Sequence, residues 1–181
     1  MLGDAIDRKR TLTKADISDA YLKAKRHGEV EFMELPAELP MTDEDGDELC
    51  IMLTSPIWGE PSAGWEWFVA LHAALSEFGW RPCEAVPCMW RHDGVKGDAV
   101  LITIVDDLLF SESEDSKGAI TDQTIALLKK RFGALTHERW PTSFAGYKLI
   151  WNEDGSLSLS MEQKVMEAAP GACPHPRGPQ G

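Results

Sequence analysis

Three aspartates have the residue type and the spacing that a metal-dependent phosphoryl-transfer site requires. Asp106 and Asp107 are adjacent between two apolar runs, AVLITIV and LLF, and Asp16 follows the short run TLTKA. Adjacent like charges repel, and Asp-Gly or Asn-Gly would close a tight hairpin better, so a bound cation would account for the pair. Mg²⁺ is typically held by one or two carboxylates together with substrate phosphates. The alternative is a plain turn, because aspartate is a common turn residue.

A strand and a β-hairpin are the elements that must position these aspartates. Residues 11–18 are predicted to form a short strand, followed by a brief helix or turn over residues 18–24. Asp106-Asp107 is predicted to form the tip of a hairpin with two apolar arms. If the strand and the hairpin are neighbours in one antiparallel sheet, the carboxylates converge at one edge. Two metal ions held there would bind the attacking and leaving oxygens of an in-line phosphoryl displacement.

The remaining pattern predicts an α+β domain with an antiparallel sheet, since helices and hairpins are mixed without regular βαβ alternation. One helix is expected over residues 61–78, with Ser62 as its N-cap and Gly79 at its end. Its apolar residues at helical spacing are Trp65, Phe68, Val69, His72 and Leu75. The other predicted elements are a helix over 115–132 stopped by Gly133, a peripheral strand at 29–35, an acidic turn at 42–48, a strand at 49–53, a hairpin of 144–151 with 156–160, and a helix after residue 160.

Composition indicates one folded domain with an acidic surface. The chain has 181 residues, 43% hydrophobic residues and seven tryptophans, which excludes a disordered polypeptide. Its formal net charge is −12, and residues 31–60 carry nine acidic side chains and no lysine or arginine. Such a charge argues against a stand-alone nucleic-acid binder, because phosphate binding requires positive charge. The four cysteines do not suggest a disulfide scaffold, and no secretory signal or membrane span is visible, so an intracellular protein is expected.

Four motifs give the chain a resemblance to a known family. DISDAYL, a helix after WGEPSAGW, IVDDLLF and FAGYKLIWNEDGSLSLS occur in this order and at roughly family spacing. They resemble the reverse transcriptase of copia-type LTR retrotransposon Pol polyproteins over roughly residues 10–169. The resemblance implies a palm-like antiparallel sheet backed by helices. It also implies an RNA-directed DNA polymerase whose partners are an RNA or DNA template with primer, a deoxynucleoside triphosphate and the rest of a Pol polyprotein, without a membrane.

The same resemblance assigns roles to individual residues. It implies that Asp16 and Asp106, with Asp107 beside them, bind two Mg²⁺ (or Mn²⁺) ions and are catalytic. Tyr21 corresponds to the aromatic residue beneath the sugar of the incoming nucleotide, where its ring would exclude a 2′-hydroxyl. The hairpin that grips the primer end corresponds to Phe144, Ala145, Gly146 and Tyr147.

The chain also departs from the family pattern. Ile104 stands where Tyr or Phe precedes Val-Asp-Asp, and Glu60 lies where the family carries Gln and basic residues. Residues 1–10 are interpreted as a lead-in without the fingers region, residues 11–169 as the palm-like domain, and residues 170–181 as a disordered tail. Connection and RNase H regions are also missing. The alternative is therefore a catalytically inactive retroelement remnant that acts at most as an interaction module.

Other chemistry-bearing residues have simpler interpretations. Asp19 is expected to cap the short helix after Asp16. Residues 42–48 do not align with a calcium-binding loop and are predicted to be a solvated turn. Cys83, Cys88 and His92 lack a fourth partner and the spacing of a zinc site, so packing roles are expected. Core roles are also expected for His72 and most of the tryptophans.

Overall fold

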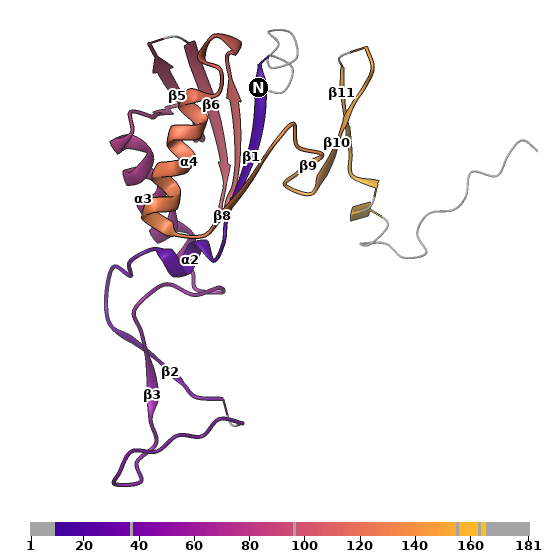
Figure 1. Cartoon of the computed structure of the whole chain (residues 1–181). Helices are drawn as coiled ribbons and strands as arrows, with labels where there is room; N and C mark the ends of the chain where they lie inside the picture. The colour runs from indigo at the N-terminus through magenta and orange to yellow at the C-terminus, as the bar shows by residue number, and fades with distance from the viewer. Residues whose placement is uncertain (1–9, 37, 96, 155, 163, 166–181) are drawn as a thin grey trace, which may run out of the picture.

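The computed structural model describes residues 10–36, 38–95, 97–154, 156–162 and 164–165. A six-stranded antiparallel sheet in the order β4-β5-β6-β7-β1-β8 forms the body of the molecule (Figure 1). Its strands are β1 (Thr11–Ile17), β4 (Arg81–Cys83), β5 (Val86–Gly94), β6 (Gly97–Ile104), β7 (Asp107–Glu112) and β8 (Leu135–Arg139). The α+β class with an antiparallel sheet is therefore confirmed.

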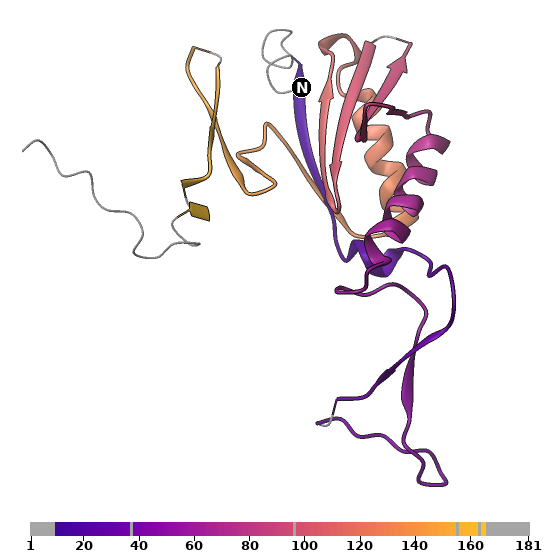
Figure 2. The same ribbon diagram turned by 180° about the vertical axis from the view of Figure 1, so that it is seen from behind.

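Two helices, α3 (Ala63–Glu77) and α4 (Ala119–Phe132), cover one face of this sheet (Figures 1 and 2). Period-two alternation explains the layer, because successive strand residues point to opposite faces. Ala15 and Ile17 of β1 and Leu108 and Phe110 of β7 all point towards the helices and belong to the main core. Lys14 and Asp16 alternate with them and lie on the other face. The face of the sheet opposite α3 and α4, called the open face below, therefore carries the polar side chains of β1.

The helix predicted at 61–78 exists, and its predicted apolar face is confirmed in part, because Leu75 is buried and Phe68 packs against the core. Trp65 is 66% exposed, whereas Trp67 is 2% exposed and packs edge-on against Phe132. Hydrophobic spacing alone therefore included the exposed Trp65 and left out two buried residues, Trp67 and Glu66. Ser62 occupies the N-cap position with a helical backbone and makes no side-chain capping bond, so its predicted capping role is also wrong.

The C-terminus of α3 ends as the sequence predicts. Gly79 has φ +94°, a conformation that favours glycine. The Gly79 N–H donates to the Ser76 carbonyl at 3.0 Å, and the Trp80 N–H donates to the Leu75 carbonyl at 3.0 Å. This pair of bonds is a Schellman motif, which stops the helix and turns the chain into β4.

The helix predicted over 115–132 is divided in two. A 3₁₀ turn, η1 (Glu114–Ser116), is followed by Lys117 and Gly118 in the left-handed conformation, and α4 starts only at Ala119. The N-terminus of α4 is instead capped from the sheet: the buried Glu112 accepts hydrogen bonds from the Ile120 and Thr121 N–H groups, both at 2.9 Å. Gly133 stops α4 as predicted, with φ +87°.

Helix α2 (Ala20–Lys23) follows β1 and confirms the predicted short helix. Asp19 does occupy its N-cap position, but it has φ 56° and ψ 43° and makes no side-chain capping bond. A capping side chain normally requires a β-region backbone at this position. The prediction that Asp19 caps the helix is therefore wrong.

A two-stranded ribbon of β2 (Glu31–Glu34) and β3 (Cys50–Leu53) projects from the body below α2 (Figures 1 and 2). The ribbon confirms the two predicted strands. The acidic turn is also confirmed: the Asp43 carboxylate accepts the N–H groups of Asp45 and Asp47, both at 3.0 Å.

A second sheet contains β9 (Ser143–Phe144), β10 (Tyr147–Trp151) and β11 (Leu157–Ser160), as the predicted hairpin requires. After β11 the Val165 N–H donates to the Met161 carbonyl at 3.0 Å, which is one helical turn. The rest of the predicted terminal helix and the predicted tail at 170–181 lie outside the described residues. None of the helices in the described part of the chain is long and apolar enough to cross a membrane.

Candidate functional site

Strand register brings the three predicted acidic residues to one end of the sheet. β1 pairs antiparallel with β7, and Asp16 and Asp107 are direct register partners. Asp106 precedes Asp107 in the hairpin turn, and its carbonyl accepts a hydrogen bond from the Ile17 N–H at 3.2 Å. The predicted adjacency of the two segments is confirmed. The metal-binding role of the three carboxylates stays a prediction.

The turn that carries Asp106 is held in an unfavourable conformation. Val105 has φ 55°, and a β-branched residue with positive φ is a rare outlier that costs about 1–3 kcal/mol. The buried Trp67 offsets this cost, because its indole N–H donates to the Val105 carbonyl at 2.7 Å. A core side chain of α3 thus fixes the turn that presents the aspartates. Nothing in the sequence pattern reveals this bond.

Negative charge is concentrated around Asp16. The pKa of Asp16 is raised above its ordinary value, first by burial and then by repulsion from Asp106 and Asp107, while Lys14 opposes the shift. The Lys14 ammonium lies 3.6 Å from a carboxylate oxygen of Asp107, and both side chains are 24% exposed. One lysine therefore faces a group of three carboxylates, and this imbalance is what a divalent cation would relieve.

We expect the substitution Asp16→Asn to stabilise the protein in metal-free buffer at neutral pH while removing a proposed metal ligand. The raised pKa means that the folded state binds the Asp16 proton more tightly than the unfolded state. Stability therefore falls as pH rises from the unfolded pKa through the folded pKa, and asparagine removes that loss. A rise in Tm of about 1–3 °C at pH 7, shrinking towards pH 3, is expected in thermal melts. A lower Tm at pH 7 would contradict the electrostatic interpretation.

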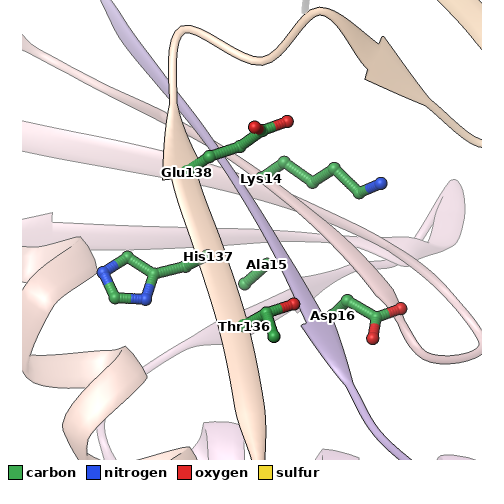
Figure 3. A pocket seen from close by; sticks show the side chains of 6 residues that line it. All are labelled: Lys14, Ala15, Asp16, Thr136, His137 and Glu138. Atoms are coloured by element: carbon green, nitrogen blue, oxygen red, sulfur yellow. The ribbon is translucent and has the colours of Figure 1, made fainter.

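A shallow hollow of about 310 Å³ opens beside Asp16, between β1 and β8 (Figure 3). Asp16 and Lys14 extend to the same side of β1, with Thr136 and Glu138 of β8 next to them, because Asp16 pairs with Thr136 and Lys14 with Glu138. His137 points away from Asp16. The hollow offers carboxylate, hydroxyl and ammonium groups on one open face, and can admit a polar substrate.

Lys14 is the site residue that the sequence reasoning missed. The sequence could have identified Lys14, because residues two apart in a strand share a face and Lys14 is two residues before Asp16. The predicted strand therefore already placed an ammonium group beside the carboxylate. Its contact with Asp107, in contrast, required the register between β1 and β7.

The predicted sugar-contacting residue Tyr21 lies in α2, directly after β1 and at the end of the sheet where β1 ends (Figure 1). It is half-buried and packs against the main core. Its ring meets the exposed Trp58 edge-on, with 6.0 Å between centroids. The two rings form a partly exposed aromatic surface, and Tyr21 lies five residues after Asp16 in the chain.

The predicted primer-grip hairpin is a tight turn between β9 and β10. Ala145 and Gly146 both have positive φ, at 48° and 80°, and Phe144 and Tyr147 are register partners. Buried Phe144 packs with Leu109 of β7, which is two residues from Asp107 and shares its face. Tyr147 is exposed. The hairpin therefore docks on the same open face that carries Asp16 and Asp107.

The sequence position of Glu60 suggested an unpaired negative charge near the start of α3, but the structure shows Glu60 in an ion pair. Both of its carboxylate oxygens accept hydrogen bonds from the Arg26 guanidinium at 2.9 Å. Arg26 also pairs with Glu31. The acidic departure from the family pattern is thus neutralised by a basic residue of the segment that follows α2.

Packing explains His92 and His72, as predicted. His92 lies against the rings of Phe78 and Trp80, and its Nε2 is 3.1 Å from the Phe78 carbonyl oxygen. His72 meets Trp90 edge-on. Cys88, in contrast, is exposed, so its predicted packing role is wrong, and the described cysteines are all free.

The donor set fits a hard divalent cation. Carboxylate oxygens are the ligands that Mg²⁺ prefers, and Mg²⁺ commonly uses one or two of them with water and substrate phosphates completing the shell. Within the described ranges, no three His, Cys, Asp or Glu side chains are arranged as a ready-made metal cage. A cation bound at Asp16 would therefore need water or substrate oxygens to complete its shell.

No protein-family model matches the chain, and no curated protein matches it.

Proposed function

We propose that this chain is the palm portion of a reverse-transcriptase-type nucleotidyltransferase, which adds deoxynucleotides to a primer 3′-hydroxyl. The observation that carries the proposal is the register pairing of Asp16 with Asp107, with Asp106 in the adjoining turn. Two sequence segments about ninety residues apart supply carboxylates to one point on an open sheet face. Such convergence is what two-metal phosphoryl transfer requires.

The fold supports the finer assignment of a palm-like domain. A six-stranded antiparallel sheet is backed by α3 and α4 on one face, and its other face carries Asp16 and the β9–β10 hairpin. These are the positions that the motif resemblance gives to the sheet, the helices and the primer grip. Tyr21 lies in α2, which follows directly after β1, the strand that carries Asp16 near its end.

In the proposed reaction the primer 3′-oxygen attacks the α-phosphorus of a deoxynucleoside triphosphate. The bond from the α-phosphorus to the bridging oxygen breaks, pyrophosphate leaves, and the hydroxyl proton passes to solvent. Bound Mg²⁺ would neutralise the phosphate charge and lower the pKa of the attacking hydroxyl. Asp16 and Asp106 would hold the cations, Tyr21 would position the sugar, and the Phe144–Tyr147 turn would orient the primer end. Lys14 supplies positive charge beside Asp107.

Two measurements on the purified chain test the proposal together. Primer extension on an RNA template is expected with Mg²⁺ or Mn²⁺ and not with EDTA. Thermal melts are expected to show a higher Tm with Mn²⁺, since a ligand that binds only the folded state stabilises it. Absence of both effects would overturn the proposal and favour the remnant interpretation, which the net charge of −12 also supports.

We expect Lys14→Gln to tighten Mn²⁺ binding, because the lysine ammonium competes with the cation for Asp107. Removing one charge of a partly exposed ion pair is worth about 0.2–1 kcal/mol, so the Kd should fall by about 1.4- to fivefold in isothermal titration calorimetry. Lys148→Gln serves as a control, since Lys148 is an exposed lysine of β10. Unchanged or weaker binding by Lys14→Gln would contradict the competition.

A further inference from the structure

The ribbon of β2 and β3 exposes apolar side chains on both of its faces. Phe32 pairs with Met52 on one face and Met33 with Ile51 on the other. Phe32 is 62% exposed and Met52 is 54% exposed, and the Met33–Ile51 pair is also exposed. We call residues 29–54, which contain this ribbon, the β2–β3 arm; it extends away from the body in both views (Figures 1 and 2). No packing within the described residues covers either face.

An isolated two-stranded ribbon is marginally stable in water, because stability requires a third strand or a packed face. In the described part of the chain, β2 and β3 pair only with each other, so their outer edges are free to accept another strand. Contiguous exposed apolar surface of this kind is typical of a binding surface. The arm therefore has the backbone and the side chains for β-strand addition.

Charge identifies the chemistry of the partner. The β2–β3 arm carries nine acidic residues and no lysine or arginine. A hollow of about 370 Å³ in the arm is lined by the acidic residues Glu34 and Glu48 together with apolar Leu35, Met41 and Leu49. Lysine and arginine pack their methylene stems on apolar surface while the charged head reaches carboxylates. The hollow thus fits a basic side chain.

We propose that the β2–β3 arm is a docking surface for a basic segment of another protein that alternates lysine or arginine with aliphatic residues. The segment adds as a third strand at an edge of the ribbon. Its aliphatic side chains cover Phe32 and Met52, and a basic side chain enters the hollow beside Glu34 and Glu48. This interaction is independent of the metal site and of nucleotidyl transfer.

Charge also excludes the other occupants. A second copy of the chain would bring the same nine acidic residues to the contact, and like charges across an interface oppose association. Nucleic acid is a polyanion and would be repelled in the same way. A basic polypeptide alone satisfies both the carboxylates and the apolar pairs.

Fluorescence anisotropy with a labelled peptide of alternating lysine and valine, nine residues long, tests the proposal on the full chain. Saturable binding is expected, with the Kd rising as salt is added. Peptides of alternating lysine and serine, or glutamate and valine, are expected to bind at least about tenfold more weakly, because each lacks one of the two complementary chemistries. Equal binding of the lysine–serine peptide would overturn the proposal, as would no binding of the lysine–valine peptide.

Matched variants place the binding on the arm. Phe32→Ser with Met52→Ser should weaken binding at least about tenfold, whereas Leu159→Ser, an exposed leucine of β11, should change it by less than about twofold. Glu34→Gln with Glu48→Gln leaves the ribbon's apolar pairs intact and should weaken binding about fivefold or more. The exposed pair Glu114→Gln with Glu153→Gln removes the same charge elsewhere. Equal weakening by this control pair would show attraction to net charge alone and would overturn the proposal.

Discussion

Replacing Asp106 with asparagine is expected to lower primer extension by about 10²–10³-fold while the protein stays folded. Asparagine keeps the size of the side chain but removes the charge that would hold a cation at the hairpin tip, and losing one preorganised charge-stabilising group typically costs about 10²–10³-fold in rate. The Trp67 bond to the Val105 carbonyl is untouched, so the turn should keep its conformation. Initial rates of extension with Mn²⁺ measure the effect.

The control for this substitution is Asp115→Asn. Asp115 is an exposed acid in η1, beyond the opposite end of β7 from the turn, so its loss changes net charge by the same amount. Its extension rate should stay within about twofold of the parent chain, as expected for a surface change away from the site. Extension by Asp106→Asn at the rate of Asp115→Asn would remove Asp106 from the proposed metal site.

Replacing the buried Glu112 with alanine is expected to destabilise the protein by about 3–4 kcal/mol. The carboxylate accepts two hydrogen bonds at the N-terminus of α4, and bonds to charged groups are worth about 1.5–3 kcal/mol each. The Ile120 and Thr121 N–H groups would be left buried without a partner. Tm should therefore fall by about 6–16 °C in thermal melts.

Two variants distinguish this capping bond from a loss of volume. Glu112→Gln keeps an acceptor oxygen and the side-chain size, and should cost about half as much as alanine. Glu114→Ala removes an exposed acid two residues later and should stay within about 0.5 kcal/mol of the parent chain. Equal losses for Glu112→Gln and Glu112→Ala would indicate that the helix-capping charge, and not packing, accounts for the whole effect.

Local patterns were sufficient to predict most elements and the meeting of the acidic segments. Alternation in TLTKADI defines β1, and apolar arms around Asp106-Asp107 define the β6–β7 hairpin. Both segments end in aspartate, so an antiparallel pairing that buries their apolar faces also brings the acids together. Periodicity predicted this convergence on the condition that the two segments are neighbours in one sheet, and the register of β1 with β7 meets that condition.

Features that depend on contacts distant in sequence could not be predicted in this way. The buried face of α3 is set by Trp67 reaching the Val105 carbonyl, and the start of α4 is set by Glu112 on a neighbouring strand. The spacing of hydrophobic residues in the sequence predicts neither of these hydrogen bonds. A buried glutamate in a strand also resembles a surface residue until the helix above it is known, so the division of the 115–132 segment was missed.

The buried Arg10 gives the β1–β7 pairing a fixed starting point. Its guanidinium donates to the Ser111 side chain at 3.0 Å and to the Ser111 carbonyl at 2.9 Å. The number of residues between Arg10 and Asp16 therefore determines the face of the sheet on which Asp16 lies. With the present number the carboxylate lies on the open face, and with one residue more or fewer it would point into the apolar layer under α3 and α4. Substitutions between Arg10 and Asp16 do not change this number. A single inserted or deleted residue in this segment would move Asp16 to the buried face of the sheet. The acidic site would then be lost in one mutation, and no later point substitution would restore it.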